Sequence, residues 1–135
     1  MFNVLKVDHI GIAVKDLEVA KEFYTKKLGM EVHGEEVIDS QHVKVCFIPS
    51  GDSELELLES TSIDGPIAKF IEKNGQGIQH IALNVDNIEN ALVDLKAKDV
   101  RLIDEVPRYG AGGASIAFVH PKSTGGILLE LTQRK

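Results

Sequence analysis

The hydrophobic and polar positions of the chain follow one pattern that occurs twice within 135 residues. The segments VDHIGIAV (7–14) and IQHIALNV (78–85) are apolar runs typical of buried strands, and each contains one histidine. Each run is followed by a polar link, an amphipathic helix and a second strand, within residues 15–32 and 86–103. Two further strand-like runs close each half. The pattern therefore predicts the order βαβββ, written twice.

Helix ends and closing strands support this interpretation. Asp16 in the first copy, and Asp86 or Asn87 in the second, are suitable N-caps, and Gly29 is a suitable end for the first helix. The apolar face of the first helix consists of Leu17, Ala20, Phe23 and Tyr24, and that of the second of Ile88, Ala91, Leu92 and Leu95. The closing strands are expected in HVKVCFIPS (42–50), SELELLES (53–60), ASIAFVH (114–120) and GILLELTQ (126–133).

The repeat predicts a single α+β domain over residues 1–135. Residues 1–62 and 77–135 form its two modules. Residues 63–76 between them predict a short linker helix, with Pro66 in the first turn and Gly75 at the end. We expect the two βαβββ modules to pair into a curved mixed sheet around a cleft.

Strand alternation predicts which side chains face that cleft. His9 shares a face with small residues, and the bulky aliphatic residues of its strand lie on the opposite face, toward the helix. His80 follows the same rule in the second copy. Glu56 and Glu130 stand on the last strand of each module, opposite the leucines. All four polar side chains should therefore lie on the side of the sheet away from the helices.

These four residues are the candidate metal ligands. A single histidine or glutamate on a strand is more often structural than a ligand. A repeated His…Glu pattern on matching faces is harder to explain in that way. The ligands would be His9, Glu56, His80 and Glu130, a donor set that suits one divalent ion per chain. We expect Co²⁺, with Mn²⁺, Ni²⁺, Zn²⁺ and Fe²⁺ as chemically reasonable alternatives.

Charge and composition restrict the classes of partner that the protein can have. The net charge of −6 argues against nucleic-acid binding, and no apolar run is long enough to span a membrane. Cys46 is the only cysteine, so no internal disulfide can form, and it is expected in the core. The opening MFNVLKVDHI lacks the pattern of a secretory signal. We therefore expect a cytoplasmic protein with neither a nucleic-acid nor a membrane partner.

Three segments carry a family resemblance: KVDHIGIAVKDLEVAKEFY (6–24), GPIAKFIEKNGQGIQHIAL (65–83) and RLIDEVPRYGAGGASIAFVHPKSTGGILLEL (101–131). With them the chain resembles the vicinal oxygen chelate (glyoxalase/bleomycin resistance) superfamily and, within it, the methylmalonyl-CoA epimerase family. The resemblance implies a homodimer and a metal held by the four residues named above. It implies interconversion of (R)- and (S)-methylmalonyl-CoA in propionyl-CoA metabolism, by removing and returning the C2 proton through a metal-stabilised enolate.

Inversion at C2 calls for two acid/base groups or one mobile group. Glu130 is one candidate. The other family carboxylate falls on Ser40 in this sequence, which departs from the pattern, and Asp39 one residue earlier is the candidate that replaces it. Asp39 can equally be a solvated turn residue. Lys122 and Ser123, in the HPKSTGG loop, are candidates for holding the substrate's anionic groups.

Two other functions fit parts of the pattern. A glyoxalase I-like lyase could use the same four ligands, although the residues beyond the ligands favour the epimerase. A metal-free protein that sequesters a small molecule could share the fold, but retention of all four ligands argues against it.

Overall fold

The computed structural model describes residues 1–135 and contains eight strands and three α-helices. They are β1 (Val4–Ala13), α1 (Leu17–Glu22), β2 (Gly34–Ile38), β3 (Val43–Ser50), β4 (Ser53–Ser60), α2 (Pro66–Asn74), β5 (Gly77–Val85), α3 (Ile88–Ala97), β6 (Arg108–Tyr109), β7 (Ser115–Val119) and β8 (Leu129–Gln133). This order confirms the α+β class and the repeated βαβββ pattern, with α2 as the expected helix between the copies. None of the helices has both the length and the hydrophobicity needed to cross a membrane.

The chain forms two compact units. One is His9–Gln79, and the other combines Met1–Asp8 with His80–Lys135. The boundaries fall inside β1 and β5. The division into modules 1–62 and 77–135 within one domain stays a prediction.

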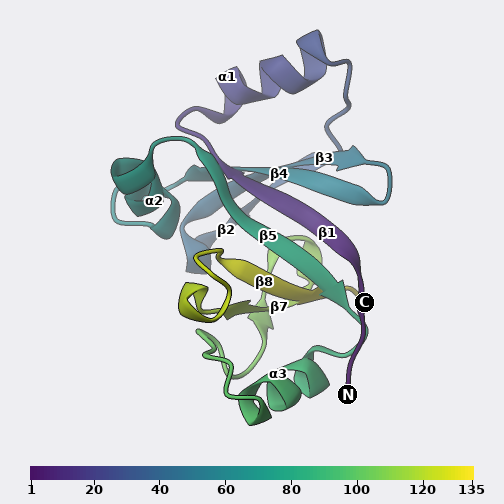
Figure 1. Cartoon of the computed structure of the whole chain (residues 1–135). Helices are drawn as coiled ribbons and strands as arrows, with labels where there is room; N and C mark the ends of the chain where they lie inside the picture. The colour runs from purple at the N-terminus through teal and green to yellow at the C-terminus, as the bar shows by residue number, and fades with distance from the viewer. The chain divides into compact units, whose positions relative to one another are not determined.

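In the unit His9–Gln79, the strands lie in the order β2-β3-β4-β1. Strand β1 is parallel to β4, and the other pairs are antiparallel. Helix α1 packs against β4 (Figure 1). The buried core of this layer consists of Val14, Leu17, Cys46, Ile48 and Leu57. The aliphatic strand face therefore packs on the helix, as predicted, and Cys46 lies in the core, where burial raises the pKa of its thiol to about 11.

Helix α1 begins as predicted and then changes its geometry. The Asp16 carboxylate accepts hydrogen bonds from the backbone N–H groups of Glu18 and Val19, at 3.0 and 3.2 Å. After Glu22 the helix widens into a π-helical turn, Phe23–Lys27. Tyr24 packs against the core, but Phe23 is 53% exposed. Phe23 lies on the same side of the helix as Ala20 and Tyr24, where the three line one hollow, but it is not buried there.

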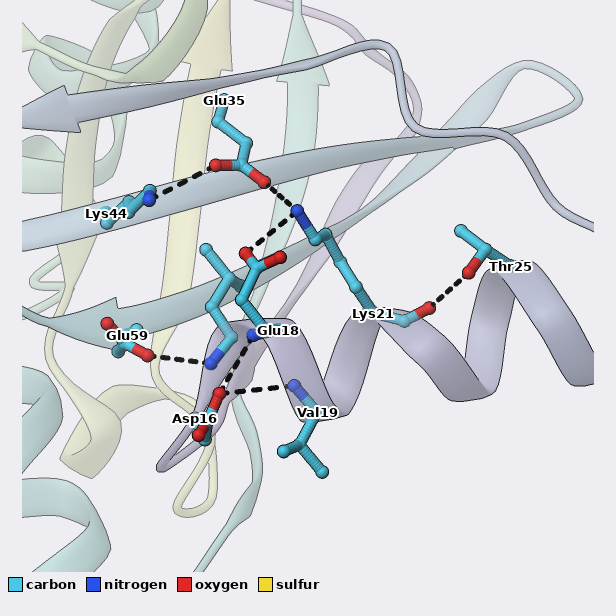
Figure 2. A network of polar contacts seen from close by, with 9 residues as sticks. Asp16, Glu18, Val19, Lys21, Thr25, Glu35, Lys44 and Glu59 are labelled. Carbon is cyan, nitrogen blue, oxygen red and sulfur yellow. Dashed lines mark hydrogen bonds and ion pairs between the residues drawn. The ribbon is translucent and has the colours of Figure 1, made fainter.

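A network of charged side chains ties α1 to β2 and β3 (Figure 2). Lys21 of α1 donates to one carboxylate oxygen of Glu35, and the other oxygen lies 3.3 Å from Lys44 Nζ. Lys21 Nζ also lies 2.9 Å from Glu18 Oε2. The hydrogen bond from Lys21 is the main reason that the pKa of Glu35 is lowered. The network adds electrostatic support to the apolar packing of α1.

In the other unit, the strands lie in the order β5-β8-β7-β6, with β5 parallel to β8 and the remaining pairs antiparallel. Helix α3 packs on β7 and β8. It begins at Asn87, whose side chain accepts from the Asn90 N–H at 2.9 Å. The buried core consists of Val85, Ile88, Ala91, Leu92, Ala117, Val119 and Leu131. The second copy therefore places its aliphatic strand face against its helix in the same way as the first.

The second strand of the first copy begins later than predicted. It was expected within residues 15–32, but β2 starts at Gly34. The π-helical turn extends the helical segment to Lys27, and Met30 and Val32 then pack against the core from the connection that follows. These apolar residues are thus partly buried without forming a strand.

The second strand of the second copy is also displaced. It was expected within residues 86–103, where the structure has only a single bridge between Leu102 and Val119. The N–H groups of both Ile103 and Asp104 donate to the carbonyl of Phe118, at 2.9 and 3.3 Å. A carbonyl that accepts from two consecutive N–H groups cannot continue the regular hydrogen-bond ladder between two strands. Pairing resumes only at β6, Arg108–Tyr109.

We predict that Glu35→Gln lowers the free energy of unfolding by about 0.5 kcal/mol at neutral pH, the usual size of such an ion pair. Because the folded-state pKa of Glu35 is lowered, its contribution is present above the unfolded-state pKa and is lost as pH falls through the folded-state pKa. Urea denaturation of wild type and Glu35→Gln should therefore show that their free energies of unfolding converge as the pH falls through this range.

The matched control is Glu22→Gln. Glu22 also pairs with a lysine, but its side chain is 66% exposed against 25% for Glu35. We expect Glu22→Gln to lower the free energy of unfolding by less than Glu35→Gln does. A difference for Glu35→Gln that stays constant down to the lowest pH would contradict the electrostatic explanation.

Candidate functional site

The first His–Glu pair lies within the unit His9–Gln79. His9 on β1 and Glu56 on β4 are both buried, and His9 Nδ1 lies 3.3 Å from Glu56 Oε2. The strand register places Gly11 directly opposite Glu56. A residue without a side chain at this point leaves the space that the imidazole and the carboxylate occupy together.

The second pair, in the other unit, has the same separation but uses the other imidazole nitrogen. His80 on β5 and Glu130 on β8 are both buried, and His80 Nε2 lies 3.3 Å from Glu130 Oε1. Here Ala82 lies directly opposite Glu130. In both copies a small residue, two positions after the histidine, is thus the register partner of the glutamate.

Each pair offers a nitrogen and an oxygen suited to one divalent cation. Two ligand atoms about 2.1 Å from the same ion are about 3.0 Å apart in an octahedron and about 3.4 Å apart in a tetrahedron. The separation of 3.3 Å in each pair lies within this range. Neutral imidazole and carboxylate together suit several first-row metals. His9, His80 and Glu130 are residues that could hold a metal ion, and Glu56, beside His9, offers the same donor chemistry.

An aromatic ring and a cation extend the polar face of the second unit. The ring of Phe118 meets the His80 imidazole edge to face, with centroids 5.7 Å apart. The guanidinium carbon of Arg108 lies 5.3 Å from the centroid of the same ring. Strand register places Phe118 directly opposite Glu130. Sequence reasoning did not find this stack, because only the sheet brings β6, β7 and β5 together.

A buried ionic network lies in the same unit. Asp8 is buried, and its carboxylate accepts from Arg134 Nη2 at 2.6 Å, from Arg134 Nε at 3.2 Å and from Asn84 Nδ2 at 2.9 Å. Arg134 Nη1 also donates to the carbonyl of Ala111 at 3.3 Å. These bonds compensate the buried carboxylate. They also connect Arg134 to the glycine-rich segment 110–113. Strand alternation placed Asn84 on the polar face, but nothing local in the sequence indicated Arg134.

One buried hydroxyl has no hydrogen-bond partner. Thr132 is completely buried, and its Oγ1 bonds to no protein atom. It stands two residues after Glu130 on β8 and lies opposite Asn84 in the register. Thr132 therefore belongs to the polar face of this unit, and its hydroxyl carries a desolvation cost that no bond offsets.

The predicted acid/base position lies on a short turn. Asp39 begins a 3₁₀ turn, Asp39–Gln41, directly after β2, and both Asp39 and Ser40 are exposed. The Asp39 backbone carbonyl accepts from the His42 N–H at 3.2 Å. Its side chain makes no contact with His9 or Glu56. The Asp39 carboxylate is therefore exposed to solvent in this structure.

The predicted substrate-binding residues also lie on a short turn, Pro121–Ser123. Both Lys122 and Ser123 are exposed. The Ser123 hydroxyl accepts from the Arg101 N–H at 2.8 Å, which leaves its own O–H available as a donor. The Lys122 N–H donates to His120 Nδ1 at 3.0 Å, so the turn is capped by a side chain. The Lys122 ammonium group stays in solvent.

Comparison with known proteins gives a consistent family. Residues 8–118 match the model of the glyoxalase/bleomycin resistance protein/dioxygenase superfamily. The mitochondrial methylmalonyl-CoA epimerase of Bos taurus is 42% identical over 135 residues, which cover 98% of this chain and 77% of the bovine protein.

Solved structures agree with the sequence comparison. Methylmalonyl-CoA epimerase from Mycobacterium tuberculosis superposes with a TM-score of 0.93 at 37% identity, covering 98% of this chain and 89% of that one. A methylmalonyl-CoA epimerase in complex with methylmalonyl-CoA and NH₄⁺ gives a TM-score of 0.92 at 37% identity, over 97% and 95% of the two chains. These likenesses confirm the predicted glyoxalase-like fold.

We predict that Thr132→Val raises the free energy of unfolding by about 1 kcal/mol, because it removes a buried hydroxyl that has no partner while keeping a branched side chain. The control is Thr25→Val, since the Thr25 hydroxyl donates to the carbonyl of Lys21 at 2.9 Å. We expect that substitution to lower the free energy of unfolding. Urea denaturation measures both, and a loss of stability in Thr132→Val would show that the hydroxyl is bonded in solution.

Proposed function

Because the chain belongs to the glyoxalase/bleomycin resistance protein/dioxygenase superfamily and, within it, to the methylmalonyl-CoA epimerase family, we propose that it interconverts (R)- and (S)-methylmalonyl-CoA. One observation carries the proposal. Each unit buries a His–Glu pair with the same spacing and the same small residue opposite the glutamate. The proposed setting is propionyl-CoA metabolism in the cytoplasm, with a homodimer as the working form.

We propose further that one divalent ion per chain, Co²⁺ in the first instance, is held by His9, Glu56, His80 and Glu130. The donor chemistry of the two pairs supports this assignment. Such an ion supplies Lewis-acid polarisation of the thioester oxygen when it is bound. The protein's own part is to hold two imidazoles and two carboxylates away from water.

Epimerisation requires a proton to leave one face of C2 and return on the other. C2 lies between a thioester and a carboxylate, so its proton is acidic enough for a carboxylate base once the developing charge is stabilised. Glu130 is the proposed group on one face, since it is buried on the polar face of β8. Asp39 is the proposed group on the other face. Its exposed side chain makes no hydrogen bond within the protein, so the carboxylate is available to a ligand.

The substrate also carries anionic groups that need a partner. Lys122 and the Ser123 hydroxyl are proposed for this role. The ammonium group is exposed, and the Ser123 O–H remains free to donate after its oxygen has accepted the Arg101 N–H. Both residues belong to the capped 3₁₀ turn Pro121–Ser123.

We predict that metal removal abolishes epimerisation and that Co²⁺ restores it. Co²⁺ at 100 times its Kd should also stabilise the metal-free protein by about 2.7 kcal/mol, by mass action. His9→Ala should lose both effects, whereas His33→Ala, at an exposed position, should keep them. Enantiomer-resolved turnover and urea denaturation with and without Co²⁺ measure the two effects.

Other outcomes identify the alternatives. Full activity after metal removal would contradict the metal proposal. Turnover of the hemithioacetal of methylglyoxal and glutathione, with none of methylmalonyl-CoA, would identify a glyoxalase I-like lyase. A protein that gains no stability from Co²⁺ or Mn²⁺ and turns over neither substrate would fit small-molecule sequestration.

We predict that Asp39→Asn slows solvent-deuterium incorporation at C2 from one enantiomer by about 10²-fold or more, the usual contribution of a positioned acid/base group. The other enantiomer should still exchange through Glu130. The control is Asp64→Asn, at another exposed position of the same unit. Equal incorporation in Asp39→Asn and wild type, for both enantiomers, would remove Asp39 from the mechanism.

A further inference from the structure

Arg108 occupies an unusual position on the polar face of its unit. The β6–β7 register pairs Arg108 with Ile116, and Phe118 lies two residues farther along β7 on the same face. The guanidinium carbon lies 5.3 Å from the Phe118 centroid, within cation–π range. The same ring meets the His80 imidazole at 5.7 Å. The guanidinium and the imidazole are therefore no farther apart than these two distances together.

One nitrogen of the guanidinium lies close to a carboxylate. Arg108 Nε lies 3.3 Å from Asp104 Oδ1. The other oxygen of Asp104 accepts the Phe118 N–H at 2.9 Å. The carboxylate is thus bonded to the strand that carries the ring beneath the guanidinium. Backbone, carboxylate and ring together hold Arg108 in one place.

The two terminal nitrogens of Arg108 have no partner in the protein. An arginine that serves only as an ion pair usually meets a carboxylate with two parallel bonds. Here the contact with Asp104 is at Nε, no hydrogen bond joins Nη1 or Nη2 to another residue, and the side chain stays 44% exposed. The fork of Nη1 and Nη2 is therefore both oriented and accessible. Its planar geometry matches two oxygens of a carboxylate or a phosphate.

We propose that Arg108 is a specificity-determining residue that binds paired anionic oxygens of the acyl-CoA substrate. This inference rests on the proposed function. Arg108 lies over the ring of Phe118, and the same ring meets His80, which is proposed to hold the metal. The oxygens can come from the malonyl carboxylate or from a CoA phosphate, and both present the same chemistry to the fork.

The experiment compares Arg108→Met, which removes the fork, with Arg108→Lys, which keeps the charge. Calorimetry measures the Kd of methylmalonyl-CoA, of methylmalonyl-pantetheine, which lacks the CoA phosphates, and of propionyl-CoA, which lacks the carboxylate. Losing a charged bidentate contact should raise Kd about 10- to 100-fold in Arg108→Met. Arg108→Lys should fall between that variant and wild type. The control is Lys73→Met, which removes an exposed cation of α2, in the other unit.

The ligands separate the two sources of oxygens. If the fork binds the carboxylate, Arg108→Met weakens the binding of methylmalonyl-CoA and methylmalonyl-pantetheine but not the binding of propionyl-CoA. If the fork binds a phosphate, the variant weakens the binding of the two CoA ligands but not the binding of the pantetheine ligand. A Kd within twofold of wild type for all three ligands overturns the proposal. Unchanged thermal unfolding and Co²⁺ binding exclude a folding defect.

Failure of the proposed function gives a different result. A wild-type protein that binds methylmalonyl-CoA without turning it over contradicts epimerisation alone. A raised Kd in Arg108→Met still supports the anion site in that case. With active wild type, the same contact should raise KM much more than it lowers kcat, because the fork lies at the substrate's anionic group and not at C2. A loss confined to kcat would contradict the assignment.

Discussion

The structure depends on burying an imidazole beside a carboxylate on a strand, once in each unit. Removing either group from water is costly unless the other, or a cation, compensates it. His9 and Glu56 approach each other to 3.3 Å, and His80 and Glu130 approach to the same distance. Gly11 lies opposite the glutamate in the first copy, where a large side chain would occupy the space of the pair. The choice of residues around each pair follows from this requirement.

The two faces of each strand layer therefore differ in role, one packing against a helix and the other carrying a polar pair. The aliphatic face packs against α1 in one unit and α3 in the other, and supplies most of the stabilising burial. The opposite face carries the polar pairs. Because adjacent side chains alternate, the chain can hold polar chemistry one residue away from a fully buried leucine, as Glu56 next to Leu57 illustrates. The helices stabilise the strands without contributing to the polar face.

Charged groups elsewhere are compensated according to their exposure. Asp8 is buried, and Arg134 and Asn84 together satisfy its carboxylate. Arg108 is half exposed and keeps two nitrogens available, although Asp104 and Phe118 fix its position. A fully satisfied cation stabilises a fold, whereas a held but unsatisfied one is prepared for a ligand. This contrast distinguishes the structural arginine from the one that we assign to recognition.

The sequence by itself determined the repeated βαβββ order, the core position of Cys46 and the strand faces of both His–Glu pairs, because hydrophobic periodicity is a local property of the chain. It misplaced the second strand of each copy, since a π-helical turn and a shared acceptor carbonyl depend on packing. Only the tertiary structure decided that Gly11 and Ala82 lie opposite the glutamates, that Arg134 compensates Asp8 and that Arg108 stacks on Phe118. Strand register and contacts between residues far apart in the chain decide these features, and neither leaves a periodic trace in the sequence.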